Sequence, residues 1–245
     1  MESDKIYNMD CLEGMKLIPD GSIDAIICDL PYGTTANKWD SIIPFDQLWE
    51  QYKRIVKPNA PIVLFGSEPF STLLRMSNLD WYKYDWIWEK DRPSNFMLAK
   101  YQALKVHEIV SIFYKSAGTY NPQGLRPCNK KNSGYSAGGG TNISSSYDGT
   151  KYTQEFENYP TSILKFDVER DGFHPTQKPV DLLRYRICTY SNEGDTILDN
   201  CMGSGTTAVA CIKEKRHFIG FELNKEYFDK ACKRIDAERR QLSLF

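Results

Sequence analysis

Short apolar runs alternate with amphipathic helical segments along most of the chain. The runs that predict strands, because they are rich in β-branched and aromatic side chains, are residues 22–28, 62–65, 84–88, 108–114, 196–198 and 217–221. The segments that predict helices, because their apolar positions recur at helical spacing, are residues 45–56, 180–187, 206–213 and 227–235. This alternation predicts an α/β fold, with a mostly parallel sheet and helices on both faces.

The periodicity disappears between residues 116 and 160. A tract rich in Gly and Ser occupies residues 133–149, and tyrosines are interleaved with basic residues around it. A segment of roughly 45 residues without a pattern is too long for a simple connector, and such segments are usually functional or disordered. We therefore expect an inserted, partly flexible segment that divides one domain made of residues 1–115 and 161–245.

Charge is nearly balanced over the whole chain but unevenly distributed along it. The 245 residues carry 31 Lys and Arg against 32 Asp and Glu, which excludes a polycation that holds nucleic acid by bulk charge. Residues 1–50 contain three lysines and ten acids, whereas residues 115–151 contain five cations and one acid. The second group is typical of a solvated loop surface, but with its tyrosines it also suits contact with phosphates and stacking on bases.

Cysteine usage and hydropathy place the protein in a cellular setting. The seven cysteines form no C-x-x-C pair and the three histidines are scattered, so we expect neither a disulfide framework nor a metal site. The longest apolar stretch, near residues 60–66, is far shorter than the ~20 residues that span a bilayer. The first residues are too acidic for a signal peptide. We expect a cytoplasmic protein without a membrane partner.

A glycine-containing loop, Asp199-Asn-Cys-Met-Gly203-Ser-Gly205, follows one predicted strand and opens a helix. Two glycines separated by one residue let the backbone turn sharply and bring a ligand close to bare N–H groups. Glu222 ends the next predicted strand, where an acid can accept hydrogen bonds from the ribose of an adenosine-containing cofactor. The loop alone fits NAD as well as other adenosine cofactors. Asp199 favours a cofactor that carries a cation and no phosphate.

A second loop, Asp29-Leu-Pro-Tyr32-Gly33, also follows a predicted strand directly. Pro31 stiffens the turn and removes a backbone donor. Asp29 can accept a hydrogen bond from an exocyclic amine, and Tyr32 offers a face on which an extruded base can stack. A Pro-Tyr-Gly turn that merely caps a strand would have the same sequence, so the functional interpretation depends on the pairing of this loop with the one at Asp199.

Together, the motifs resemble a known family. In chain order they are Asn8-Met-Asp-Cys11, Asp29-Leu-Pro-Tyr32, the segment from Val106 to Lys115, His174-Pro-Thr-Gln-Lys-Pro179, Asp199 to Gly205 and Glu222-Leu-Asn-Lys-Glu-Tyr227. The chain resembles the β group of S-adenosylmethionine-dependent DNA amino-methyltransferases, and the likeness covers nearly its whole length. The resemblance implies a circularly permuted, Rossmann-like class I methyltransferase fold with an inserted target-recognition segment at residues 116–160. Leu30 departs from the usual proline of the family motif, and Cys201 from the usual Phe.

The resemblance also implies roles for individual residues. The implied catalytic residues are Asp29, Leu30, Pro31 and Tyr32. The implied contacts with S-adenosyl-L-methionine are Asp10, Cys11, Asp29, Thr176, Gln177, Lys178, Asp199, Cys201, Met202, Gly203, Ser204, Gly205, Thr206, Glu222 and Leu223. The implied reaction is direct transfer of the sulfonium methyl to the N6 amine of a flipped adenine, without a covalent enzyme intermediate.

DNA is the implied partner, and several alternatives stay open. Arg126 is a candidate for contact with a guanine edge, and Lys130 and Lys131 are candidates for contact with phosphates. N4-cytosine methylation uses the same amine chemistry, and RNA is a further possible substrate. An NAD-dependent oxidoreductase and an inactive DNA-binding module are alternatives from other classes. Family members can form homodimers and can accompany a cognate restriction endonuclease.

Overall fold

The computed structural model describes residues 1–34, 40–132, 152–170 and 177–242. The chain forms two compact units. The larger unit contains Met1–Asn121 and Ser162–Phe245, and the smaller contains Pro122–Thr161. Each unit is described by itself.

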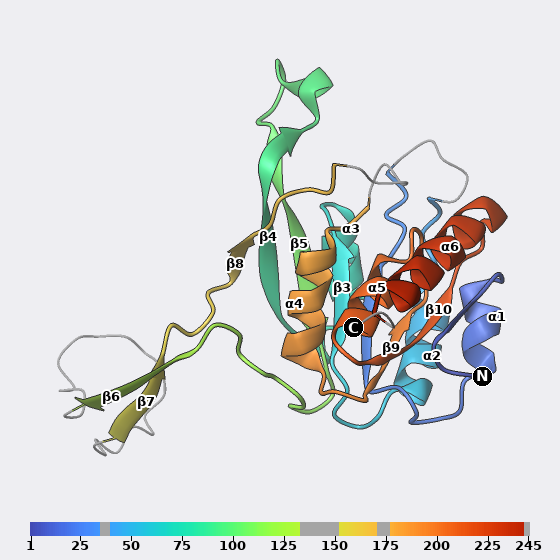
Figure 1. The fold of residues 1–245 in the computed structure, drawn as a ribbon. Coiled ribbons are helices and arrows are strands. Elements are labelled where there is room, and N and C mark those ends of the chain that lie inside the picture. Colours follow the sequence, from blue (N-terminus) through green and yellow to red (C-terminus); the bar gives the residue numbers. More distant parts are fainter. Residues whose placement is uncertain (35–39, 133–151, 171–176, 243–245) are drawn as a thin grey trace. The chain divides into compact units, whose positions relative to one another are not determined.

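An eight-stranded sheet forms the centre of the larger unit, with the strand order β1-β10-β9-β2-β3-β5-β4-β8 (Figure 1). The strands are β1 (Lys5–Tyr7), β2 (Ala25–Asp29), β3 (Ile62–Gly66), β4 (Tyr82–Ser94), β5 (Lys105–Phe113), β8 (Ile163–Lys165), β9 (Thr196–Asp199) and β10 (His217–Phe221). All neighbours from β1 to β3 are parallel, and β5 runs antiparallel to both β3 and β4. The predicted α/β fold with a mostly parallel sheet is therefore confirmed.

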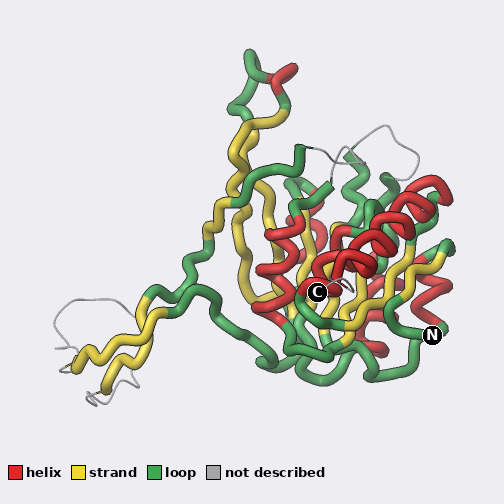
Figure 2. The backbone as a smooth tube through the Cα atoms, in the orientation of Figure 1, coloured by secondary structure: helices red, strands yellow, loops and turns green. Residues whose placement is uncertain are grey.

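Helices cover both faces of this sheet, as predicted. They are α1 (Cys11–Lys16), α2 (Phe45–Ile55), α3 (Phe70–Met76), α4 (Val180–Tyr190), α5 (Thr206–Lys213) and α6 (Lys225–Leu242), and a short 3₁₀ helix, η1, spans Phe96–Leu98. Apolar side chains of α1, α2 and α3 pack on one face of the sheet. Those of α4, α5 and α6 pack on the other, where Figures 1 and 2 show these three helices together. Residues such as Ile26 and Leu198 have no exposed surface, and complete burial of one such side chain stabilises the fold by about 1.5–3 kcal/mol.

The residues at the ends of the predicted elements explain where those elements begin and stop. Pro44 precedes the first turn of α2, and Pro179 holds the same position before α4. Proline suits these places because the first helical N–H groups have no partner within the helix. On β4, Trp86 and Trp88 are buried in the core.

Several short elements were not predicted. They are β1, β8, α1 and α3, none of which is longer than seven residues. Runs of three to seven residues show too few periods for a hydrophobic pattern to emerge. The helix α1 depends instead on a local cap, since Asp10 Oδ1 accepts hydrogen bonds from the N–H groups of Leu12 at 2.9 Å and Glu13 at 3.2 Å.

The strands β4 and β5 continue as a hairpin past the end of β3 (Figure 2). Ile109 pairs with Gly66, the last residue of β3, so the preceding residues of β5 lie beyond the carboxyl edge of the parallel sheet. Glu108 is the first of them, and it pairs with Trp88 across the hairpin. The hairpin thus brings Glu108 to the edge of the sheet where the loops after β2 and β9 begin.

The smaller unit contains an antiparallel pair of strands, β6 (Arg126–Asn132) and β7 (Tyr152–Glu157). Both strands lie within residues 116–160, where the sequence shows no periodic pattern and no strand was predicted. Their sequences are polar, and Pro127 falls within β6, so neither shows the apolar alternation by which a half-buried strand is recognised. Within the described residues of both units, no helix is long and apolar enough to cross a membrane.

Candidate active site

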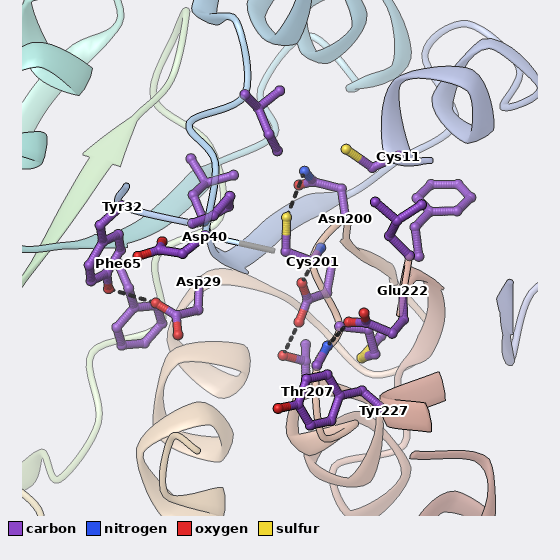
Figure 3. Close-up of a pocket in the computed structure, with 18 of the residues that line it drawn as sticks. Cys11, Asp29, Tyr32, Asp40, Phe65, Asn200, Cys201, Thr207, Glu222 and Tyr227 are labelled. Atoms are coloured by element: carbon purple, nitrogen blue, oxygen red, sulfur yellow. Dashed lines mark hydrogen bonds between the residues drawn. The ribbon is translucent and has the colours of Figure 1, made fainter. Parts of the chain in front are cut away.

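The two loops singled out in the sequence meet at one edge of the sheet. The strands β2 and β9 are parallel neighbours, with Ile26 paired to Leu198, so their carboxyl ends at Asp29 and Asp199 open on the same side. A pocket of about 500 Å³ lies there (Figure 3). This volume falls within the ~300–1,000 Å³ range of small-molecule sites, and the carboxyl edge of a parallel sheet is where such sites form in α/β folds.

Asp199 is a buried acid without a cation beside it in the described structure. Its Oδ1 accepts a hydrogen bond from the Cys201 N–H at 3.0 Å, and its Oδ2 accepts one from the Thr207 hydroxyl at 2.5 Å. Only 4% of the residue is exposed. Burial raises the pKa of Asp199 to about 6, although these hydrogen bonds act in the opposite direction. An acid in this state favours a ligand that brings a positive charge.

Glu222 follows β10 and is fixed by backbone donors. Its Oε2 accepts a hydrogen bond from the Gly203 N–H at 2.8 Å, and its Oε1 accepts one from the Asn224 N–H at 2.7 Å. Gly203 has a φ of +53°, a conformation that glycine adopts without strain. Burial raises the pKa of Glu222. The sharp turn at Gly203 thus positions a carboxylate at the wall of the pocket, where its remaining lone pairs can accept hydroxyl donors.

Asp29 lies at the other end of the pocket, in a cluster of charged and aromatic groups. The Tyr32 hydroxyl donates to Asp29 Oδ1 at 2.6 Å, as Figure 3 shows, and Lys178 Nζ donates to Oδ2. The ring of Tyr32 packs against Phe70 with centroids 5.1 Å apart. Burial and the charge of Asp29 raise the pKa of Tyr32 well above its usual value, so its hydroxyl stays protonated.

Lys178 is 7% exposed and joins two carboxylates. Besides Asp29, its Nζ lies 3.3 Å from Glu108 Oε2. Burial alone would lower the pKa of Lys178, but the charges of Asp29 and Glu108 outweigh it and raise that pKa. Glu108 in turn accepts a hydrogen bond from Lys90 Nζ at 2.5 Å. Lys178 was predicted as a cofactor contact, and the structure places its ammonium on Asp29 and Glu108.

Most of the remaining predicted residues also line the pocket. They are Asp10, Cys11, Leu30, Pro31, Gln177, Cys201, Met202, Ser204, Thr206 and Leu223. Thr176 and His174 lie outside the described residues. Gly205 does not line the pocket. It caps α5 with a φ of +76°, and a Cβ atom there would lie 3.1 Å from the Cβ of Ala231 on α6, so its place in the structure is explained by close helix packing.

The sequence reasoning missed several residues of the pocket. Asn200 Oδ1 accepts a hydrogen bond from the buried Tyr52 hydroxyl at 2.5 Å. Asp40 accepts hydrogen bonds from the N–H groups of Gly33 and Thr34, both at 2.9 Å, and so holds the turn after Tyr32. Asn200 has a sequence signal, because it lies inside the glycine loop. Asp40 has none, since its contact depends on how the chain returns after the turn.

The predicted nucleic-acid contacts belong to the smaller unit. Arg126 begins β6 opposite Glu157 of β7. Lys130 and Lys131 continue the same strand, and their side chains lie outside what the structure describes. In the described parts of the chain, no cluster of His, Cys, Asp and Glu has the arrangement of a metal site.

The residues at the Asp199 end of the pocket fit an adenosine cofactor with a cationic amino-acid portion. Asp10, Asp199 and Glu222 all line this end, so it presents acceptors and negative charge. Ribose hydroxyls and an ammonium are donors that such a wall can bind, whereas a pyrophosphate would be repelled. Among the described residues, the buried Gln177 Oε1 has no hydrogen-bond partner, so a donor of a ligand could bind it.

Known proteins of similar sequence are methyltransferases. The chain is 29% identical over 267 residues to the type II methyltransferase M.HinfI of Haemophilus influenzae. This alignment covers 94% of this chain and 67% of that protein. It is 28% identical over 250 residues to the DNA adenine methyltransferase YhdJ of Escherichia coli K12, which covers 96% of this chain and 83% of that protein.

Solved structures agree with this relationship. The crystal structure of M1.HpyAVI in complex with SAM superposes with a TM-score of 0.64 at 27% identity, covering 94% of this chain and 98% of that one. The cytosine-N4-specific PvuII DNA methyltransferase superposes with a TM-score of 0.69 at 16% identity, covering 96% and 86%, and shares the fold. The family model described as DNA methylase, of the N6/N4 type, matches residues 23–233. The chain belongs to this DNA methylase family.

Proposed function

We propose that the protein transfers a methyl group from S-adenosyl-L-methionine to the exocyclic N6 amine of an adenine in DNA. The observation that carries this proposal is the meeting of Asp29 and Tyr32 with Asp199 and Glu222 in one pocket. One end offers acceptors for a cationic adenosine cofactor, and the other offers an acid and an aromatic ring for a base. Family members use S-adenosyl-L-methionine.

The proposed cofactor residues act by holding charge and hydroxyl groups in place. S-adenosyl-L-methionine, when bound, supplies an electrophilic methyl group on its sulfonium. Glu222 accepts hydrogen bonds from ribose hydroxyls, and Asp199, ionised above pH ~6, holds the ammonium of the methionine portion. Cys11, Met202 and Leu223 supply apolar surface between these acids.

The proposed catalytic residues act on the amine of the base. That amine is a poor nucleophile because its lone pair is delocalised into the ring. The Asp29 carboxylate and a backbone carbonyl at Leu30 or Pro31 accept hydrogen bonds from its two N–H groups, which favours a more tetrahedral nitrogen. When the nitrogen gains the methyl group it releases one of these protons, to Asp29 or to water. Tyr32 holds the extruded base by stacking. Positioning supplies much of the rate, since no covalent bond to the protein has to form.

Sequence recognition is assigned to residues 116–160, which include the smaller unit. Arg126 is proposed to contact a guanine edge, and Lys130 and Lys131 are proposed to contact phosphates. Removal of a phosphate contact should weaken binding to every sequence about equally and reduce its salt dependence, whereas removal of the guanine contact should relax specificity at one position.

N4-cytosine methylation is the second candidate, because the pocket chemistry serves either exocyclic amine. The similarity to a protein named as a DNA adenine methyltransferase favours adenine. The test is incubation with labelled S-adenosyl-L-methionine and unmethylated genomic DNA, followed by nuclease digestion and mass analysis of the nucleosides. Detection of N6-methyladenine supports the proposal. Detection of N4-methylcytosine instead would identify cytosine as the target base. Absence of label in DNA, with cofactor binding demonstrated, refutes both.

A further inference from the structure

Both oxygens of the Asp29 carboxylate already accept a hydrogen bond. The Tyr32 hydroxyl donates to Oδ1 at 2.6 Å and the Lys178 ammonium donates to Oδ2. The proposed reaction requires the Asp29 carboxylate to accept a hydrogen bond from the amine of the target base. An ammonium on the same carboxylate draws negative charge away from the oxygens and weakens them as acceptors. Movement of Lys178 away from Asp29 would therefore strengthen the carboxylate as an acceptor for the amine.

Lys178 cannot move into water. Its side chain is 7% exposed, and its ammonium lies 5.8 Å from the centre of the Tyr32 ring and 5.4 Å from that of Phe65. A buried ammonium that loses its anion is destabilised by about 3–5 kcal/mol. Lys178 needs a second carboxylate within a short movement.

Glu108 meets this requirement. Its Oε1 is held by Lys90 at 2.5 Å, whereas its buried Oε2 accepts no hydrogen bond from any described residue. Lys178 Nζ lies 3.3 Å from that Oε2, within ion-pair distance but without hydrogen-bond geometry. A movement of about 1 Å would take the ammonium out of hydrogen-bonding range of Asp29 Oδ2, and Glu108 Oε2 is near enough to bind it after that movement. Glu108 also lines the pocket, so the movement takes place beside the proposed base site.

We propose that Glu108 is a positioning residue that receives the ammonium of Lys178 when the target base binds Asp29. This inference rests on the proposed function. The cluster contains two carboxylates, Asp29 and Glu108, and two ammonium groups, Lys90 and Lys178. The exchange moves one ammonium between these two carboxylates, so it adds no charge to the cluster. Glu108 acts through Lys178 and is not itself required to touch the base.

Steady-state kinetics with a methylatable DNA test the exchange. Glu108→Gln leaves Asp29 as the acid bound to Lys178, so we expect kcat to fall by about 10–100-fold while the cofactor Kd changes by less than about threefold. Glu108→Asp, which keeps the charge, should recover most of kcat. Glu89→Gln is the matched control, because this exposed acid lies on the neighbouring strand of the hairpin, and it should behave as wild type.

The double variant Glu108→Gln/Lys178→Gln separates this role from a structural one. With no ammonium left on Asp29, we expect the kcat of the double variant to equal or exceed that of Glu108→Gln. If the two substitutions caused independent structural losses, kcat would instead fall by the product of their separate effects. Wild-type kcat in Glu108→Gln, or a double variant well below it, overturns the inference. Failure of the proposed function is distinguishable, because the wild-type protein would then transfer no methyl group to the N6 amine of adenine.

A crystal structure of the full chain soaked with 2′-deoxyadenosine gives a readout independent of turnover. We expect Lys178 Nζ within about 3.0 Å of Glu108 Oε2 and beyond about 3.5 Å from Asp29 Oδ2 when the base contacts Asp29. A base bound to Asp29 with Lys178 unmoved would contradict the exchange. Should Glu108→Gln fold poorly, as judged by its thermal unfolding, the soaked wild-type crystals and Glu108→Asp kinetics still decide the question.

Discussion

Asp199 should destabilise the cofactor-free protein at neutral pH, and Asp199→Asn should therefore stabilise it. Burial raises the pKa of Asp199 from 3.8 to about 6. One pKa unit corresponds to 1.36 kcal/mol, so ionisation in the folded state costs about 3 kcal/mol relative to the unfolded chain. Asparagine keeps the geometry, because its oxygen can accept from the Cys201 N–H while its amide donates to the Thr207 hydroxyl.

The pH dependence of this effect has a definite sign. Below pH ~4 Asp199 is protonated in both states and contributes no penalty. Between about pH 4 and pH 6 the unfolded chain releases this proton before the folded protein does, so the free energy of unfolding declines as pH rises. Above pH ~6 the penalty is complete. The difference between Asp199→Asn and wild type should thus grow across this interval and then remain constant.

The assay is urea denaturation of both proteins at pH 4.5, 6 and 8, with cofactor binding measured by calorimetry at pH 8. At pH 8 we expect the free energy of unfolding of Asp199→Asn to rise by about 2–3 kcal/mol, equivalent to a rise of about 4–12 °C in Tm. The same change should weaken cofactor binding about 10–100-fold, since a charge-assisted contact contributes about 1.5–3 kcal/mol. A variant destabilised equally at every pH would refute the electrostatic reasoning.

Three further changes test other parts of the structure. Asp29→Ala should abolish methyl transfer while the cofactor Kd, measured by calorimetry, stays within about threefold, and retained turnover would exclude its catalytic role. Gly205→Ala should lower the free energy of unfolding by about 1–3 kcal/mol in urea, because it adds backbone strain and a close contact with Ala231. Gly194→Ala, with a φ of +84° and open space around it, isolates the strain and should cost less. Arg186→Met should be neutral or stabilising in thermal unfolding, because this buried guanidinium has no hydrogen-bond acceptor in the structure, and a loss above about 2 kcal/mol would contradict that view.

The sequence predicted the parts of the fold that bury long apolar faces. Strands such as β3 and β10, and the helix α2, lie within one or two residues of their predicted bounds. Burial on both sides makes such strands continuous apolar runs, which local reading detects. The sequence did not predict the polar strands β6 and β7, because their stability comes from pairing with each other. Nor did it predict the short helix α1, because its stability comes from the Asp10 cap.

The sequence predicted those residues of the site that lie in single loops after predicted strands. Asp29, Asp199 and Glu222 each follow a predicted strand, and parallel pairing then requires them to share one edge. The cluster around Lys178 could not be derived in this way. Glu108 reaches the pocket only because β5 runs antiparallel beside β3 and continues past its end, a matter of sheet topology and not of local sequence.

The charges of the pocket differ between its two ends in a way that suits two different ligands. Asp199 and Glu222 are held by backbone N–H groups and a hydroxyl, so their negative charge is only partly compensated and attracts a cation. The charge of Asp29, by contrast, is compensated by an ion pair with Lys178. A cationic cofactor therefore gains free energy at the first end and little at the second, whereas an uncharged base can enter the second end without burying a charge. The cofactor and the base are therefore selected by separate groups. Substitutions at Asp199 should mainly alter cofactor affinity, and substitutions at Glu108 should mainly alter the catalytic step.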